Sequence, residues 1–193
     1  MKTIKTRVLV VVFMLGTLVN YANNKEVSNV LNAKKVKVVF EGAKKGQQLT
    51  IKDNNGIILH SENVISSGNL IKTFDFSNLK NGNYFLELEK DFEIIIKSIK
   101  IKGNNVIFSE DSKKTIFKPL VRSIENKLMV SSIILDEEPL EVTIYYNNTI
   151  IYSEIANGDT ILNRIYRLDD NKKGDYKVII TKNDRNFIND FKI

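Results

Sequence analysis

The stretch that decides the fold reads LTIKDNNGIILHS, from Leu49 to Ser61, and it returns about ninety residues later as VTIYYNNTIIYSE, from Val142 to Glu154. Each copy is followed by a turn with a glycine two residues before a tyrosine, KNGNY at 80–84 and KKGDY at 172–176. The first stretch shares Thr50, Ile51, Asn54, Asn55, Ile57 and Ile58 with its copy at an offset of 93, and the later part shares Gly82, Tyr84, Lys100 and Ile101 at an offset of 92. Because the offset between matching residues changes by only one over this span, the two stretches indicate an internal duplication.

Apolar residues alternate with polar ones around both copies, as in Val36, Val38 and Phe40, which is the period of a β-strand. The Asn55-Gly56 pair predicts a hairpin, since both residues tolerate positive φ. Long apolar runs with helical period are missing. Six or seven short strands per unit predict an all-β chain of two tandem immunoglobulin-like antiparallel β-sandwiches. The predicted domains are a signal peptide at 1–22, a flexible segment at 23–34, sandwiches at 35–103 and 115–193, and a linker at 104–114.

Residues 1–22 have the order of a secretory leader. Lys2, Lys5 and Arg7 precede an apolar run from Val8 to Val19, which is shorter than the ~20 residues that span a bilayer. Cleavage is expected after Ala22. The sequence therefore predicts export to the periplasm or cell surface, without stable membrane insertion after cleavage.

Composition excludes several classes of site. The chain has no cysteine and a single histidine, so disulfides, thiolate metal sites and histidine pairs are excluded. Without the three leader cations the balance is 26 basic against 23 acidic residues, with no concentrated basic stripe, which argues against nucleic-acid binding. No catalytic or cofactor motif is present. We therefore expect no enzymatic activity, no cofactor and no metal.

The two glycine–tyrosine turns resemble the tyrosine corner of sandwich folds. In that motif the tyrosine hydroxyl bonds to backbone in the preceding loop and fixes the crossover between sheets. The predicted structural residues are Gly56, Gly82, Tyr84, Gly174 and Tyr176.

The remaining candidates are individual side chains. His60 is expected on the surface, and the acidic residues of 136–141 in a solvated loop. Tyr145, Tyr146, Tyr152 and Tyr166 cluster in the second copy, either as ordinary strand residues or as exposed rings for a glycan or protein partner. Thr160, in Asp159-Thr160-Ile161, matches a bacterial O-glycosylation acceptor.

Residues 47–102 resemble the C-terminal sorting domain family of type IX secretion. The resemblance is carried by LTIKDNNGIILHS, by DFSNLKNGNYFLELE at 75–89 and by IKSIKI at 96–101. It implies a sandwich fold and export in Bacteroidota-type bacteria. Two features depart from the family: its Pro-Asn-Pro opening is absent, and the better-matching copy is the internal one.

Two functions follow as expectations. The first is an exported, non-enzymatic structural, adhesion or binding module with an unknown protein or glycan partner. The alternative is a cargo or accessory protein of type IX secretion whose C-terminal unit acts as the sorting signal.

Overall fold

The computed structural model describes residues 29–31, 35–108, 113–135, 138–157 and 160–193. The described chain is all-β, as predicted, with antiparallel strand pairs throughout. No helix in this part of the chain has the length and apolar character needed to cross a bilayer. The predicted leader lies outside the described residues.

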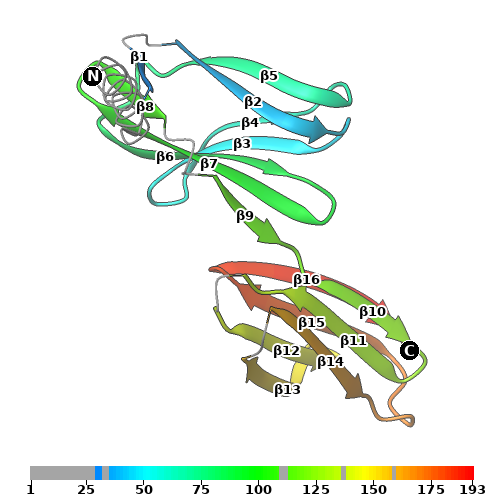
Figure 1. The fold of residues 1–193 in the computed structure, drawn as a ribbon. Helices are drawn as coiled ribbons and strands as arrows, with labels where there is room; N and C mark the ends of the chain where they lie inside the picture. Colours follow the sequence, from blue (N-terminus) through cyan, green and yellow to red (C-terminus); the bar gives the residue numbers. More distant parts are fainter. Residues whose placement is uncertain (1–28, 32–34, 109–112, 136–137, 158–159) are drawn as a thin grey trace, which may run out of the picture.

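The first unit is a sandwich of two sheets (Figure 1). Its seven-stranded sheet has the order β1-β8-β7-β6-β3-β4, with β9 also pairing β7, and its two-stranded sheet is β2-β5. The strands are β1 (Asn29–Leu31), β2 (Lys35–Ala43), β3 (Gln48–Asp53), β4 (Ile58–Asn63), β5 (Gly68–Asp75), β6 (Gly82–Glu89), β7 (Glu93–Lys102), β8 (Asn105–Phe108) and β9 (Lys114–Phe117). Side chains from both sheets fill one core, which includes Val36, Phe40, Leu49 and Leu86.

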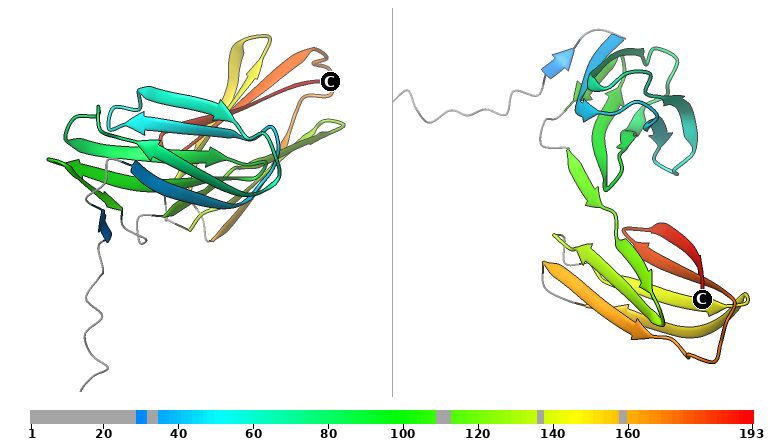
Figure 2. Two further views of the ribbon diagram at one scale, coloured as in Figure 1. Left: turned by 90° about the horizontal axis from the view of Figure 1, so that it is seen from above. Right: turned by 90° about the vertical axis from the view of Figure 1, so that its right-hand side faces the viewer.

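The second unit is also a sandwich, with a three-stranded sheet β10-β11-β14 and a four-stranded sheet β13-β12-β15-β16 (Figure 2). Its strands are β10 (Leu120–Ile124), β11 (Lys127–Ile133), β12 (Leu140–Tyr146), β13 (Thr149–Ala156), β14 (Ile161–Arg167), β15 (Asp175–Lys182) and β16 (Arg185–Lys192). It has its own core, centred on fully buried side chains such as Leu128, Ile144 and Ile180.

The strand pairing repeats between the units. The order β7-β6-β3-β4 corresponds to β16-β15-β12-β13, and the pair β2-β5 corresponds to β11-β14. The register shift in the β3–β4 hairpin, between Ile51 and Lys52, recurs in the β12–β13 hairpin between Ile144 and Tyr145. The duplication read in the sequence is therefore a duplication of strand order and register.

The register corrects the alignment of the two copies. Ile51 pairs with His60, whereas its counterpart Ile144 pairs with Tyr152, so the second hairpin is one residue shorter. Ile58 therefore corresponds to Ile150, and the offset is 93 only in β3 and β12. The physical reason is the turn: Gly56 alone has positive φ in the first, while both Asn147 and Asn148 have positive φ in the second.

The boundary between the units lies later than the predicted linker at 104–114. Within that interval β8 pairs with β7, and β9, predicted to open the second sandwich, also pairs with β7. Likewise β1, in the segment expected to be flexible at 23–34, pairs with β8. The backbone amide of Lys118 donates a hydrogen bond to the carbonyl of Phe92 in the first unit. Only Pro119 lies between this contact and the start of β10, so the boundary between the units falls at Pro119.

These pairings define a fragment that should fold alone. Ile94 and Ile96 of β7 pack against Ile116 of β9, so a fragment ending at 104 exposes them. We expect residues 25–118 to unfold cooperatively on heating, and 25–104 to melt at a lower temperature because that apolar cover is lost. Differential scanning calorimetry of the two fragments checks this. A non-cooperative melt of 25–118 would show that the two units share one core.

Candidate functional site

Both tyrosine corners have the predicted hydrogen bond. The Tyr84 hydroxyl donates to the Lys80 carbonyl at 2.8 Å, and the Tyr176 hydroxyl donates to the Lys172 carbonyl at 2.8 Å. Both rings are buried at the start of a strand. Burial raises the pKa of Tyr176. Each tyrosine therefore holds the loop that precedes its own strand, β6 or β15, which is a structural role.

The glycines of the two corners are constrained differently. A Cβ at Gly174 would lie 3.1 Å from Cε2 of Tyr146 and 3.2 Å from Oδ1 of Asn147, and φ there is +152°. A Cβ at Gly82 would only touch the Tyr84 ring at ordinary contact distance. Only the second corner therefore requires glycine for space.

A glutamate, a cation and two aromatic rings form a cluster at the edge of the second sandwich, where β13 faces β14. The Tyr166 hydroxyl donates to Oε1 of Glu154 at 2.6 Å, and the Tyr152 hydroxyl donates to Oε2 at 3.1 Å. Nε of Arg164 lies 3.5 Å from Oε1, and the two rings are 5.5 Å apart. Burial and the Glu154 carboxylate raise the pKa of Tyr166. The cluster fastens one sheet edge to the other.

The first unit has the same cluster between β4 and β5, at an offset of 92. Lys72 pairs with Oε2 of Glu62 at 2.9 Å, Nε2 of His60 lies 3.9 Å from the same oxygen, and the His60 ring meets Phe74 edge-on at 5.7 Å. Phe74 stands where the second unit has Tyr166. Oε1 of Glu62 is accordingly buried without a hydrogen-bond partner among the described residues.

This difference gives a reciprocal pair of substitutions. Tyr166→Phe removes a donor to a carboxylate and should destabilise the second unit by about 1–2 kcal/mol, while Phe74→Tyr supplies the donor that Oε1 of Glu62 lacks and should stabilise the first unit by about 1 kcal/mol. Urea unfolding of the full chain, followed by circular dichroism, measures both. If both substitutions destabilised the chain equally, the two clusters would not be equivalent.

The junction between the units is built around Glu87 of β6. Its carboxylate accepts hydrogen bonds from Lys52 at 2.7 Å and from Arg185 of the second unit. Burial raises the pKa of Glu87, but the hydrogen bonds and charges of Arg185 and Lys52 outweigh this and hold the pKa below its usual range. An apolar cluster beside it joins Phe85, Ile94, Ile96 and Ile116 to Phe187 of β16.

A second contact ties the connecting segment to the second unit. The buried Lys182 ammonium donates to the backbone carbonyls of Phe117 and Ile133 and lies 3.3 Å from the Ser132 hydroxyl. Just before Pro119, the Lys118 amide is thus bonded to the first sandwich and the Phe117 carbonyl to the second. The junction therefore restricts the orientation of the two units.

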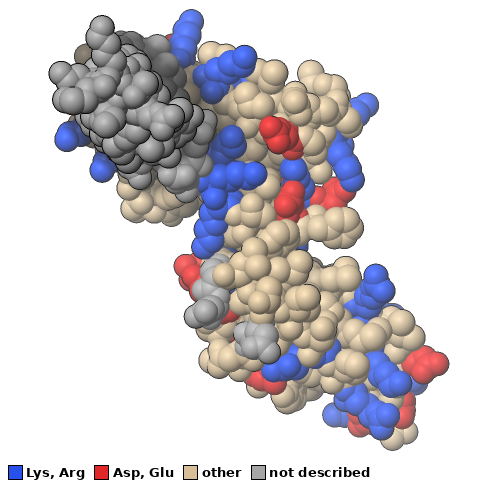
Figure 3. All heavy atoms as spheres, in the orientation of Figure 1, with Lys and Arg blue, Asp and Glu red and all other residues tan. Residues whose placement is uncertain are grey.

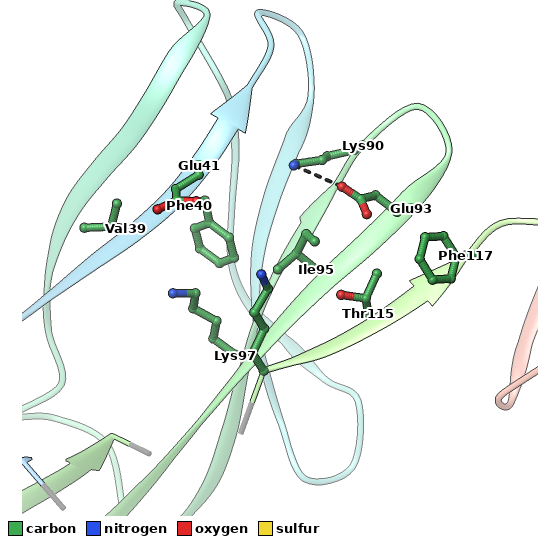
Figure 4. A pocket seen from close by; sticks show the side chains of 10 residues that line it. Val39, Phe40, Glu41, Lys90, Glu93, Ile95, Lys97, Thr115 and Phe117 are labelled. Atoms are coloured by element: carbon green, nitrogen blue, oxygen red, sulfur yellow. Dashed lines mark hydrogen bonds and ion pairs between the residues drawn. The ribbon is translucent and has the colours of Figure 1, made fainter. Parts of the chain in front are cut away.

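A cavity of about 360 Å³ lies on the open side of the first sandwich, where β2 faces β7 and β9 (Figure 4). The Lys97 ammonium lies 5.5 Å from the centre of the Phe40 ring, and Lys90 pairs with Glu93 at 3.1 Å. Thr115 and Phe117 close the other side. The cavity is therefore lined by lysines, glutamates, a threonine and apolar side chains.

The other sequence candidates are dispersed. His60 is partly exposed in the cluster described above. Thr160 is exposed, and its backbone carbonyl accepts from Ile134; its neighbour at 159 lies outside the described residues, as do 136 and 137 of the acidic stretch. No group of three or more potential metal ligands occurs among the described side chains. The structure does not bring these candidates into one site.

Sequence reasoning missed the junction and both glutamate clusters. Glu87 follows the alternation of an exposed strand position, and its partner Arg185 is 98 residues away. The glutamate clusters did leave a signal, because glutamate, cation and aromatic residues recur at an offset of 92, visible once the copies are aligned by register.

Comparison with known families gives a match to the first unit. Residues 32–102 match the family described as secretion system C-terminal sorting domain. No curated protein matches the chain. The matched segment contains β2 to β7, the six strands that the second unit repeats. The resemblance noted in the sequence is confirmed: the first unit is similar to the sorting-domain family of type IX secretion.

Proposed function

We propose that the protein is a cargo or accessory protein of type IX secretion, and that its tandem sandwiches are the part read by the secretion machinery. The observation that carries the proposal is the family match, which begins just before β2 and ends with β7 at Lys102. The match therefore covers the repeated sandwich as a unit.

The second unit extends the proposal. It shares with the matched unit the strand order, the register shift within the β12–β13 hairpin and the tyrosine corner. A receptor that recognises the folded shape of the first sandwich would meet a related shape in the second. We infer that the second unit is the sorting signal.

A non-enzymatic binding role is the second part of the proposal. It is supported by how the charged groups of the described sites are used: Glu87, Glu154 and Glu62 all serve contacts that hold strands or units together. An exposed apolar sheet on the second unit, described below, favours binding of a partner after export. Modification of exposed Thr160 by a glycan belongs to the same proposal.

Deleting residues 119–193 and locating the truncated protein tests the sorting signal. The first unit keeps β8, β9 and Lys118, so it should remain folded. We expect the truncated chain to accumulate in the periplasm while the full chain reaches the cell surface or the medium.

Deletion of residues 32–118 is the matched control. If both deletions left the protein in the compartment of the full chain, neither unit would act as a sorting signal. If only the control deletion caused retention, the first unit would be the signal and the assignment to the second would be wrong.

A further inference from the structure

The outer face of the three-stranded sheet β10-β11-β14 is unusually apolar. Its register places Ile161 opposite Ile133, and Ile165 opposite Met129, on the face away from the core. Ile161 and Ile165 are 63% and 68% exposed. The apolar side chains of this face are Leu120, Ile124, Met129, Ile133, Ile161 and Ile165.

The charges on the same face are all positive. Arg122 lies directly opposite Met129, in the same row as Ile165, and Lys127 and Arg167 lie opposite each other in the next row of this face. No ion pair joins these three cations to a carboxylate in the described part of the chain. The strands contribute only Ser131 and Asn163 as further polar groups to this face, and these bond to each other at 2.7 Å. In Figure 3, Lys and Arg side chains, with a few Asp and Glu side chains among them, lie at the end of the second unit away from the first, beside a broad uncharged area.

The equivalent face of the first unit has a different pattern, with one apolar pair, Val39 and Ile71, where the second unit has Ser131 and Asn163. At an offset of 92, Met129, Ile161 and Ile165 are replaced by the polar residues Lys37, Asn69 and Thr73, and the position of Arg167 holds Asp75. The shared scaffold therefore does not require the apolar groups. Exposed apolar area of this kind, bordered by polar and charged side chains, marks an interaction surface.

We propose that this sheet face, the apolar–basic face, binds a protein partner whose contact surface is apolar with carboxylates at its rim. Three cations without carboxylate partners call for negative charge opposite them. A second copy of the same face would bring six cations together without any acid. A membrane surface fits less well, because the face carries none of the Trp, Tyr or Phe side chains that anchor proteins at bilayer interfaces.

A photoreactive benzophenone side chain placed at position 165 of the full chain, in the source cells, tests the proposal. We expect a cross-link to one protein, which is identified by mass spectrometry, purified and titrated against the wild-type chain. Two variants test the two features of the face. The triple variant Met129→Lys/Ile161→Asn/Ile165→Thr replaces the apolar groups with the corresponding residues of the first unit, and the double variant Arg122→Glu/Arg167→Glu reverses two of the charges. Binding should weaken at least tenfold in each. The same side chain at position 73 is the matched control and should capture nothing at this mass.

The substituted positions are exposed, so a thermal transition within a few degrees of wild type confirms that the variants fold. Four outcomes overturn the proposal: no protein cross-link at 165, a cross-link to a second copy of the chain, equal binding of the purified partner by wild type and variants, or binding to phosphatidylglycerol vesicles that the triple variant loses. Each of the first three outcomes would show that this face does not bind the proposed protein partner. The last outcome would show that the face binds a membrane instead.

Discussion

Tyr176→Ala should lower the unfolding free energy of the second unit by about 3–5 kcal/mol, because it removes a large ring from a close-packed core. The side chain is 2% exposed, stacks on Phe191 with ring centres 5.4 Å apart and meets Tyr146 at 5.0 Å. Tyr176→Phe keeps the ring and removes only the bond to the Lys172 carbonyl, so it should cost about 1 kcal/mol. The corresponding pair at Tyr84 should follow the same order.

Urea unfolding of the full chain measures these losses, with the phenylalanine variants as matched controls. An unchanged midpoint for Tyr176→Ala would contradict the buried position of the ring. Equal losses for Ala and Phe would assign the whole effect to the hydroxyl and none to the packing.

Glu87→Gln should destabilise the junction by about 2–3 kcal/mol at neutral pH. This is less than the ~3–5 kcal/mol for breaking a fully buried pair, because Lys52 and Arg185 are 21% and 25% exposed while Glu87 is 8% exposed. Since the folded pKa of Glu87 is lowered, its contribution is present above the unfolded pKa and is lost as the pH falls through the folded pKa. The difference between wild type and variant should therefore shrink in acid, below about pH 4.

Urea midpoints at pH 7 and in acid test this expectation. Glu89→Gln is the control, since Glu89 pairs with Lys118 on the surface and should cost less than about 1 kcal/mol at either pH. A Glu87→Gln loss that is the same at both pH values would contradict the ionic role of Glu87.

The tandem β architecture and the tyrosine corners could be predicted because they depend on local patterns. Alternation gave the strands, and a glycine two residues before a tyrosine marked both corners. The position at which the offset between the copies changes from 93 to 92 could not be predicted from the sequence. Asn54-Asn55 and Asn147-Asn148 are identical residues in the alignment, but the two turns differ in length by one residue. The correct alignment of β4 with β13 follows from the strand register and not from the identity of the residues.

The end of the first unit could not be predicted for a different reason. β8 and β9 are four-residue strands, N-V-I-F and K-T-I-F, separated by polar residues that resemble a linker. β9 forms a strand because its Ile116 covers Ile94 and Ile96, which β7 presents outside the core. β8 forms a strand because it pairs with the end of β7 and places Val106 in the core. That requirement comes from tertiary structure.

The signal peptide at 1–22 lies outside the described residues, and the glycosylation of Thr160 is untested; both stay predictions. The intact mass of the exported protein checks both. A mature chain that begins near Asn23, with added hexose mass lost in Thr160→Ala, is the expected result.

Export by the type IX route is tested most directly by locating the full chain in cells with and without an active type IX translocon. The proposed function predicts that the protein is at the cell surface or in the medium of wild-type cells and is retained in the periplasm when the translocon is inactivated. The same distribution in both strains would contradict it.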